Sequence, residues 1–344
     1  MNEELLLRAA GPDEDAALRH LNDLAFGDNP KSRAPITAWQ WWGNPFGDTL
    51  VWVWEDDGQI VGQYVAFFAP AQLHGQPARL TLGVDAAIHP DYQGRRLFSP
   101  LARALYDDCN AHDAPLLAYP SLEASVRGIA RAGWVQVSRQ KVRVNATDPA
   151  WLAHRFHVPR VAAKAAQAAV FRTSSPSGLT AAAVTEPPAD LDELWSAVAP
   201  GHPNGIARTL AWWRWRYHEH PEQTYGYLEV RDGARLVGAT VARIREEFGG
   251  RFLCLLELMA TDERAAKAVV GAVTDGALGP ADGVVLTAAP GSRTDHLAGA
   301  GGLRALPARL DPKPVYFGVV AHPSLVPDPT ALQWSTAWGD LDHI

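Results

Sequence analysis

Alternating apolar positions mark two similar hairpins in the chain. In TLVWVWEDDGQIVGQYVAFFAP (residues 49–70), two runs of β-branched and aromatic residues flank an Asp-Asp-Gly turn, which is typical of paired strands joined by a tight turn. In YGYLEVRDGARLVGATVARI (residues 225–244), the same pattern surrounds Arg-Asp-Gly. The chain is therefore predicted to form one β-hairpin in each half.

The two hairpins belong to a longer internal repeat. Four residues recur at a constant spacing of 176 positions: Trp39, Pro45, Asp56 and Gly62 return as Trp215, Pro221, Asp232 and Gly238. After each hairpin the pattern predicts another strand, a helix, a short strand, a second helix and, beyond a glycine, more strand. We therefore predict an α/β fold class, with α+β mixed sheets, built as two tandem domains.

The expected boundaries follow from this repeat. They give a first domain at residues 1–148, a helical linker at 149–178, a second domain at 179–322 and a C-terminal tail at 323–344. The linker contains VPRVAAKAAQAAVFR, an alanine-rich stretch that predicts a helix packed on both domains, with a membrane-surface or nucleotide-contacting helix as the alternative. The spacing of Trp334 and Trp338 indicates that the tail docks on the protein.

Composition narrows the classes of function. A content of 47% hydrophobic and 20% charged residues with a net charge of -7 is ordinary for a globular protein and leaves no basic face for nucleic acid. No stretch has the ~20 apolar residues of a membrane span, and the acidic N-terminal segment does not resemble a secretory signal. We expect a cytoplasmic protein without nucleic-acid or membrane partners, and its excess of arginine over lysine suits a GC-rich bacterial genome.

The cysteines argue against a disulfide framework and against a zinc site. Cys109 and Cys254 are the only two in the chain; Cys109 lies in a helix-like stretch and Cys254 in an apolar, strand-like run. They are expected to be buried thiols, and no metal is expected. The oligomeric state stays open, with a homodimer as one option.

The stretch HPDYQGRRLFSPL (residues 89–101) carries the strongest functional signal. It joins a predicted strand to a predicted helix, so the unpaired backbone N–H groups at the start of that helix can bind an anion. Arg95 and Arg96 add positive charge. The spacing fits neither a Walker-type phosphate loop nor a dinucleotide-binding fingerprint. From the residues alone, an anion site and a plain surface turn are both open.

Together with LLAYPSLEASVRGIARAGW, this stretch resembles the signature region of the GNAT superfamily of acyl-CoA-dependent N-acyltransferases, over about residues 80 to 135. In that family the backbone amides of a turn of form Q/R-x-x-G-x-G/A hold the pyrophosphate of coenzyme A. The resemblance implies two GNAT-like domains and acetyl-CoA, or another acyl-CoA, as co-substrate. It implies cofactor contacts at Ala87, Ile88, Gln93, Gly94, Arg95, Arg96, Leu97, Phe98, Ser99 and Ser121. The family's asparagine on the next helix falls at Ser121 or Leu122.

Two positions of the turn depart from the family pattern. Arg96 stands where the family has glycine, and Phe98 where it has glycine or alanine. A side chain on left-handed backbone costs about 1–2 kcal/mol, so the backbone of Arg96 is expected to be helical. The ring of Phe98 is expected to point away from the pyrophosphate into the core.

The second half replaces this turn with Thr261-Asp262-Glu263-Arg264. Its two carboxylates would repel a pyrophosphate at the helix end that otherwise attracts one. The second half is therefore expected to keep the fold without the cofactor, and to shape the substrate cleft or stabilise the first half.

Asp85 is the first candidate for a catalytic base. It interrupts an apolar strand shortly before the turn, where similar enzymes often carry an acidic residue acting through water, and burial would raise its pKa toward neutrality. The alternative is that Asp85 caps the strand end or pairs with an arginine. His89 is a second candidate base.

The other catalytic roles are less well defined by the residues. The resemblance implies that a backbone amide at Ala87 or Ile88 polarises the thioester carbonyl. Tyr119 is either a proton donor facing the cleft or a buried core tyrosine. The family's usual tyrosine donor corresponds to Ile129, which cannot donate a proton.

Two further clusters invite a functional interpretation. AWQWW (residues 38–42) and AWWRWRYHEH (residues 211–220) are predicted helices whose aromatic side chains pack in the core, with stacking on a ligand as the alternative. The chain ends with Asp340, Asp342 and His343, which suit a metal or an amine but are more typical of a solvated tail.

These features predict an N-acyltransferase that moves an acetyl or other acyl group from acyl-CoA to a small-molecule amine by direct attack in a ternary complex. Amino sugars, amino-acid-derived metabolites and antibiotic-type amines are the expected acceptors. A tRNA-dependent aminoacyl transferase is a second class, against which the lack of a basic face argues. A GNAT-fold module that binds a ligand or partner without catalysis is a third, favoured by Ile129 and Arg96.

Overall fold

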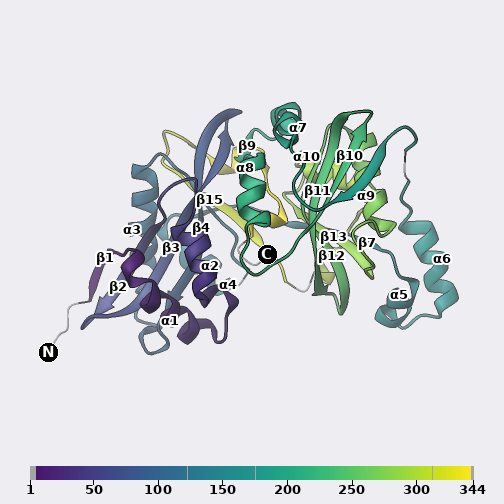
Figure 1. The fold of residues 1–344 in the computed structure, drawn as a ribbon. Coiled ribbons are helices and arrows are strands. Elements are labelled where there is room, and N and C mark those ends of the chain that lie inside the picture. The colour runs from purple at the N-terminus through teal and green to yellow at the C-terminus, as the bar shows by residue number, and fades with distance from the viewer. Residues whose placement is uncertain (1–4, 122, 175, 312, 342–344) are drawn as a thin grey trace.

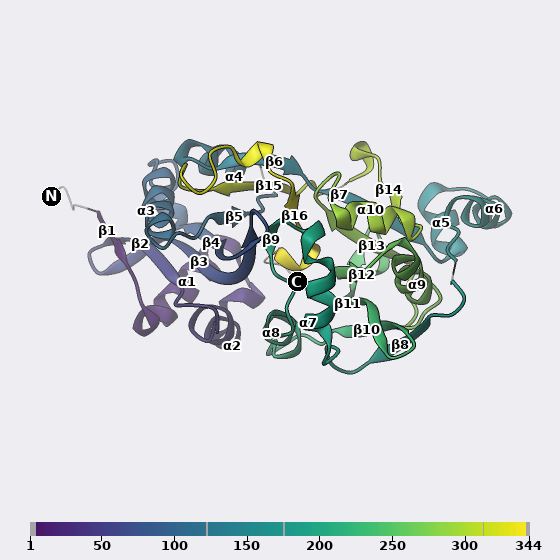
Figure 2. The same ribbon diagram turned by 90° about the horizontal axis from the view of Figure 1, so that it is seen from above.

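The computed structural model describes residues 5–341, apart from residues 122, 175 and 312. The chain forms two lobes that lie side by side (Figure 1), and each lobe is a mixed sheet with helices on both faces (Figure 2). This arrangement confirms the predicted α/β fold with two mixed sheets.

The strands divide between the two sheets. In spatial order, the first sheet contains β1 (Leu6–Ala9), β2 (Leu50–Asp56), β3 (Gln59–Leu73), β4 (Gln76–Ile88), β5 (Leu116–Ala118), β15 (Tyr316–Val320) and β6 (Val135–Arg139), with β9 (Asn204–Ile206) beside β3 and β16 (Trp334–Ser335) beside β9. The second contains β14 (Arg304–Ala305), β7 (Lys141–Ala146), β13 (Gly283–Ala288), β12 (Gly250–Ala260), β11 (Arg235–Glu247), β10 (Gly226–Asp232) and β8 (Thr180–Val184).

The helices connect and cover these strands. The α-helices are α1 (Asp15–Phe26), α2 (Ala34–Thr37), α3 (Phe98–Ala111), α4 (Glu123–Ala132), α5 (Pro149–Phe156), α6 (Arg160–Val170), α7 (Leu191–Val198), α8 (Leu210–Trp213), α9 (Glu263–Thr274) and α10 (Arg293–Ala300). Two π-helices are η3 (Ala38–Trp42) and η6 (Arg214–His218). The 3-10 helices are η1 (Pro12–Glu14), η2 (Pro30–Ser32), η4 (Pro90–Tyr92), η5 (Ala199–Gly201), η7 (Ala308–Leu310), η8 (Pro329–Ala331) and η9 (Trp338–Asp340).

The internal repeat is present in the structure at the predicted spacing. The hairpin strand β10 and the π-helix η6 have the bounds of β2 and η3, displaced by the same 176 positions. The equivalent tryptophans of the two π-helices stack on each other, with the ring centroids of Trp39 and Trp215 5.1 Å apart. Trp39 Nε1 also donates to the carbonyl of Trp215 at 3.0 Å. The two repeats therefore contact each other through Trp39 and Trp215, one of the residue pairs that define the repeat in the sequence.

Each sheet contains one strand from the opposite half of the chain. Strand β7, from the first half, lies between β13 and β14 in the second sheet. Strand β15, from the second half, lies between β5 and β6 in the first sheet. With the expected boundaries at residues 148 and 322, β7 falls in the first domain and β15 in the second, whereas each strand pairs in the sheet of the opposite lobe. Because main-chain hydrogen bonds hold both exchanged strands, the two lobes form one structural unit.

Most of the aromatic side chains in the π-helical regions are core residues, as predicted. Trp41, Trp212, Trp213 and Trp215 are at most 2% exposed and belong to a hydrophobic cluster with members in both halves of the chain. Both cysteines are buried, which confirms that prediction.

The linker is helical, but it does not pack on both domains as expected. Helices α5 and α6 lie at the outer end of the second lobe (Figure 1). Helix α6 packs on α5, and Ala163 is its buried residue. In the described part of the chain, no helix combines the length and apolar character that crossing a membrane requires.

Candidate active site

The first sheet opens between β4 and β5. These strands pair only where Thr81 and Leu82 lie opposite Leu116 and Leu117. Further along, β4 continues to Ile88 without a described strand on its β5 side, so main-chain groups of this edge are available to a ligand. A cavity of about 640 Å³ lies at the opening.

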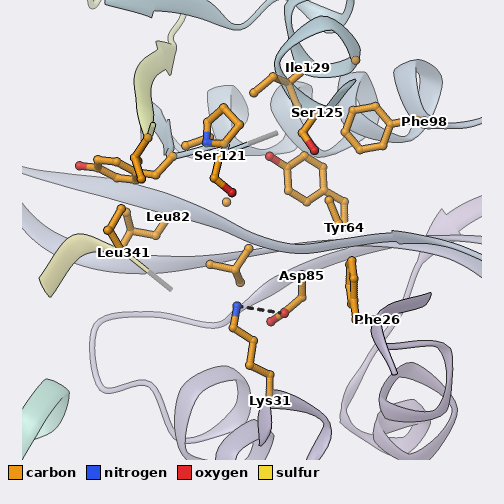
Figure 3. A pocket seen from close by; sticks show the side chains of 18 of the residues that line it. Phe26, Lys31, Tyr64, Leu82, Asp85, Phe98, Ser121, Ser125, Ile129 and Leu341 are labelled. Carbon is orange, nitrogen blue, oxygen red and sulfur yellow. Dashed lines mark hydrogen bonds and ion pairs between the residues drawn. The ribbon is translucent and has the colours of Figure 1, made fainter. Parts of the chain in front are cut away.

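The cavity reaches both faces of the sheet. On one face it is lined by Phe98 of α3 and by Ser125 and Ile129 of α4, and on the other by Phe26 of α1 and Lys31 of η2 (Figure 3). Two ligands can therefore approach the same opening from opposite faces.

Asp85 lies at the centre of this opening, on an irregular part of β4. The register between β3 and β4 shifts beside it, and its backbone has a positive φ of 50°. Such a bulge re-aims a side chain, and strain of this kind is concentrated at functional sites. Gln63 Nε2 donates to the carbonyl of Asp85 at 3.4 Å and so supports the bulge.

The carboxylate of Asp85 is buried and pairs with a lysine rather than with an arginine. Lys31 Nζ lies 3.4 Å from Asp85 Oδ1 (Figure 3). Oδ2 is buried and has no hydrogen-bond partner among the described residues. Burial lowers the pKa of Lys31, and the nearby charge of Arg216 lowers it further, against the opposing effect of Asp85. The site thus holds a carboxylate oxygen that can still accept a proton or hydrogen bond.

Tyr119, which follows β5, lines the same cavity and begins a buried polar network. Its hydroxyl donates to Asp340 Oδ2 at 3.2 Å. Arg208 forms two hydrogen bonds with Asp340, at 2.5 and 2.9 Å, and its Nε lies 3.1 Å from Glu257 Oε2. Tyr217 donates to Glu257 Oε1 at 2.7 Å. The network therefore joins the cavity of the first lobe to strand β12 of the second.

Burial controls the protonation of this network. It raises the pKa of Tyr119 well above the ordinary value, and the negative charge of Asp340 adds to that effect. Burial also raises the pKa of Glu257, while Arg208 opposes the rise. Tyr119 therefore keeps its proton at neutral pH.

The C-terminal segment is docked, as the tryptophan spacing predicted, but Asp340 is not solvated. Strand β16 pairs with β9, and Asp340 is 3% exposed. Arg216 donates to the carbonyls of Gly339 and Leu341 at 3.2 and 2.8 Å. The expectation of a solvated tail is wrong at Asp340 because two buried arginines bind this segment. Asp342 and His343 lie outside the described residues.

The turn before α3 presents a row of unpaired amides. The backbone N–H groups of residues 94–99 donate to no acceptor among the described residues. Gly94 and Arg96 both have positive φ, at 79° and 62°. Alternation of this kind turns successive N–H groups toward one point and forms an anion-binding nest, here at the N-terminus of a 14-residue helix.

The expected helical backbone at Arg96 is therefore wrong. The nest geometry outweighs the steric cost of a side chain on left-handed backbone. Phe98 is half-buried, and its ring lies 5.9 Å from that of Tyr64. A Cβ on Gly128 of α4 would come within 3.0 Å of the Phe98 ring, so α3 and α4 touch there.

The equivalent helix of the second lobe has no such nest among the residues that the structure describes. The side chain of Asp262 accepts from the N–H of Ala265 at 2.8 Å, and its carbonyl accepts from Ala266 at 3.0 Å. A carboxylate of the chain thus occupies the place of an anion.

The remaining sequence candidates lie around the same opening. Ala87 and Ile88 follow the cavity-lining part of β4, opposite Gln63 and Gly62 of β3. The exposed Gln93 directly precedes the nest, Ser99 lies in the first turn of α3, and Ser121 lines the cavity. His89 caps η4, where its Nδ1 accepts from the N–H of Asp91 at 3.2 Å. Leu122 lies outside the described residues. The roles assigned to these residues stay predictions.

The sequence alone does not indicate the place of Lys31, Tyr64 and Ser125 among the residues that line the cavity. Lys31 lies in a loop without apolar periodicity, where a lysine is normally solvated. Tyr64 sits in an apolar strand and looks like a core residue. The signal for Ser125 was its position one turn before Ile129 on the same helix face.

Comparison with known proteins agrees with this geometry. Residues 7–136, which run from β1 into β6, match a family model described as an acetyltransferase (GNAT) domain. The search of curated proteins gives no significant sequence match.

The structure resembles solved acyltransferases along almost its whole length. It is similar to a GCN5-related N-acetyltransferase from Anabaena variabilis, with a TM-score of 0.67, 12% identity and coverage of 92% of this chain and 72% of the other. It is also similar to a probable N-acyltransferase from Enterococcus faecalis, with a TM-score of 0.64, 14% identity and coverage of 92% of this chain and 73% of the other. For N-myristoyltransferase from Saccharomyces cerevisiae, solved with myristoyl-CoA, the TM-score is 0.57 and the identity 9%, with coverage of 93% of this chain and 83% of the other. At these identities the likeness concerns the fold.

The first lobe is a GNAT domain, and the chain as a whole has a tandem GNAT fold. The family match covers residues 7–136, and the second repeat has Thr261-Asp262-Glu263-Arg264 in place of the turn before α3.

Proposed function

We propose that the protein is an acyl-CoA-dependent N-acyltransferase that transfers an acetyl or other acyl group to a small-molecule amine. The nest at residues 94–99 would hold the pyrophosphate of the donor, because it combines free N–H groups with the positive end of the α3 dipole. The unpaired edge of β4 would hold the acyl-bearing arm in the opening beside β5.

The observation that carries this proposal is the position of Asp85. A buried carboxylate oxygen without a described partner faces the opening next to the free strand edge. A ligand amine that enters from the face of Lys31 would meet this oxygen. We assign Asp85 the role of general base, directly or through one water.

The reaction would be a direct transfer. The amine nitrogen forms a bond to the thioester carbonyl carbon, the C–S bond breaks, the amine proton passes to Asp85, and the thiolate leaves and takes up a proton. Tyr119 is our choice for the proton donor, since its hydroxyl lines the cavity and stays protonated. The acyl carbonyl would be polarised by a backbone N–H of β4, with Ala87 and Ile88 as the assigned positions.

The test separates binding from turnover. A saturable ligand at about 100 times its Kd stabilises a protein by about 2.7 kcal/mol, so acetyl-CoA should raise the Tm measurably. Asp85→Asn should keep this Tm increase and lower kcat about 100-fold or more, since a general base contributes at least that much. Asp91→Asn, at an exposed carboxylate of η4, is the matched control. Absence of any Tm increase with acetyl-CoA would remove the proposed donor.

A further inference from the structure

A second cavity, of about 230 Å³, adjoins the first, and Asn29 and Lys31 line both. Its first-lobe wall includes Trp39 of the π-helix η3. Its second-lobe wall consists of residues around η6 and of the strand β11. The cavity therefore lies between the lobes, on the face of the sheet from which the acceptor would approach Asp85.

The lining of this cavity is strongly cationic. Lys31, Arg216, Arg243 and Arg245 all contribute to it, against the single carboxylate of Glu222 among the described lining residues. Arg243 and Arg245 are alternate residues of β11, so both side chains extend from the same face of the strand. The two lobes together form the lining, and most of the positive charge comes from the second.

Among the described residues, carboxylates pair with two of these four cations and not with the other two; one of the pairs is Lys31 with Asp85, at 3.4 Å. Glu222 lies 2.7 Å from Arg33, and Glu247 lies 3.6 Å from Arg245. Among the described residues, no carboxylate is within ion-pair distance of Arg216 or of Arg243. The buried guanidinium of Arg216 is held by the backbone carbonyls of Gly339 and Leu341, which fix its position without a direct ion pair among the described residues; the carboxylates of Asp340 and Glu257 act on it only from a longer distance.

His220 lines this cavity, and its ring is neutral at physiological pH. Burial, followed by the charges of Arg216 and Arg243, lowers the pKa of its imidazole to about 4. Nδ1 accepts from the N–H groups of Glu222 and Gln223 at 3.2 and 3.1 Å, which leaves the proton of the neutral ring on Nε2. A neutral donor thus accompanies the arginines.

From this arrangement we infer that the acceptor is an amine that also bears a carboxylate, such as an amino acid. The carboxylate would bind between Arg216 and Arg243, while the amine extends past Lys31 to the opening beside Asp85. Arginine is suited to this role because its guanidinium can bind a carboxylate through two parallel hydrogen bonds. Amino sugars, polyamines and other purely cationic amines would be repelled. This inference rests on the proposed function and narrows its range of acceptors.

The experiment compares acceptors that differ only at the anionic group. Initial rates of coenzyme A release from acetyl-CoA are measured with the common α-amino acids and their α-carboxamides, with 4-aminobutyrate and 4-aminobutanamide, and with glucosamine and spermidine. We expect at least one carboxylated amine to exceed its amide about tenfold or more in kcat/KM. Arg243→Gln should reduce that ratio to near one, chiefly through KM. Arg235→Gln, at an exposed arginine of the same strand, should preserve it.

The outcomes distinguish this inference from the proposed function. If amides or amino sugars are acylated as well as carboxylated amines are, the acceptor assignment is wrong and the acyltransferase assignment stands. If no carboxylated amine reacts or shifts the Tm of a protein that binds acetyl-CoA, the acceptor assignment is wrong as well. Failure of acetyl-CoA to bind would instead overturn the donor site, which is a result of a different kind.

Discussion

Helices α3 and α9 follow the equivalent strands β4 and β12 of the two repeats, yet their first turns are used differently. Before α3 the N–H groups of residues 94–99 stay free of acceptors in the described chain, whereas before α9 the carboxylate of Asp262 accepts from the N–H of Ala265. The adjoining gaps differ in the same way. Strands β12 and β13 pair from Phe252 to Leu255, and η9 packs against both, whereas β4 and β5 separate beyond Leu82. One copy of the fold is open to an anionic ligand, and the chain itself closes the other.

The buried carboxylates of these two strands, β4 and β12, extend the comparison. Asp85 lies three residues before the end of β4, and Glu257 lies three residues before the end of β12. Both are buried beside a basic side chain, Lys31 in the first lobe and Arg208 in the second. Asp85 keeps one oxygen without a described partner at a cavity, while Tyr217 and Arg208 bind both oxygens of Glu257. The same position thus serves an opening in one repeat and a structural contact in the other.

Removing the central cation of that contact should have the largest effect. Arg208→Met leaves the buried carboxylates of Asp340 and Glu257 without their partner, and breaking a buried pair costs about 3–5 kcal/mol. Urea unfolding followed by tryptophan fluorescence measures the loss. Arg214→Met, at an exposed arginine of η6, is the control. A loss below about 1 kcal/mol would show that the network does not hold the lobes together.

His202 gives the next largest effect, through pH. It is buried beside β9, and its Nδ1 lies 3.0 Å from Ser335 Oγ of β16. Burial, followed by the charges of Arg208 and Arg293, lowers the pKa of its imidazole to about 3, so the unfolded chain takes up the proton first. Stability is therefore complete above about pH 6.5 and falls as the pH drops toward 3, by roughly 2 kcal/mol at pH 5.

The variant His202→Gln should flatten this pH dependence. Denaturant unfolding at several pH values between 6.5 and 4 measures the slope, and His154→Gln, at an exposed histidine of α5, should leave it as in the parent protein. An equal slope in His202→Gln and in the parent would assign the acid sensitivity to other groups.

The contrast between the two helix ends can be tested by exchange. Ser99→Asp places a carboxylate in the first turn of α3, as Asp262 does for α9. It should weaken acetyl-CoA binding about tenfold by repelling the pyrophosphate, and should leave the ligand-free protein as stable or more stable by about 0.3–1 kcal/mol. Asp262→Ala should cost about 1 kcal/mol of stability and should leave the Kd for acetyl-CoA unchanged. Calorimetric titration and thermal unfolding measure both. An unchanged Kd in Ser99→Asp would place the pyrophosphate elsewhere.

The sequence was sufficient for the local elements and for the repeat, because hairpin turns and apolar periodicity are local signals. It could not indicate the exchange of β7 and β15, since a buried strand has the same pattern in either sheet. Asp340 was assigned to a solvated tail because its partners, Tyr119 and Arg208, are more than a hundred positions away. The cationic cavity was missed for the same reason, since Lys31 and Arg243 meet only in the folded chain.

The backbone of Arg96 is unpredictable from the sequence for a different reason, because the local penalty on left-handed backbone does not include the geometry that a nest requires. Arg96→Gly relieves about 1–2 kcal/mol of strain and gives back about 0.5–1 kcal/mol in unfolded-chain entropy, so stability should rise slightly. It should also weaken acetyl-CoA binding about fivefold by removing a guanidinium from the phosphate. Arg96→Ala should weaken binding equally without the gain in stability. If binding is unchanged in both variants, the amides alone hold the pyrophosphate, and the side chain of Arg96 plays no part in it.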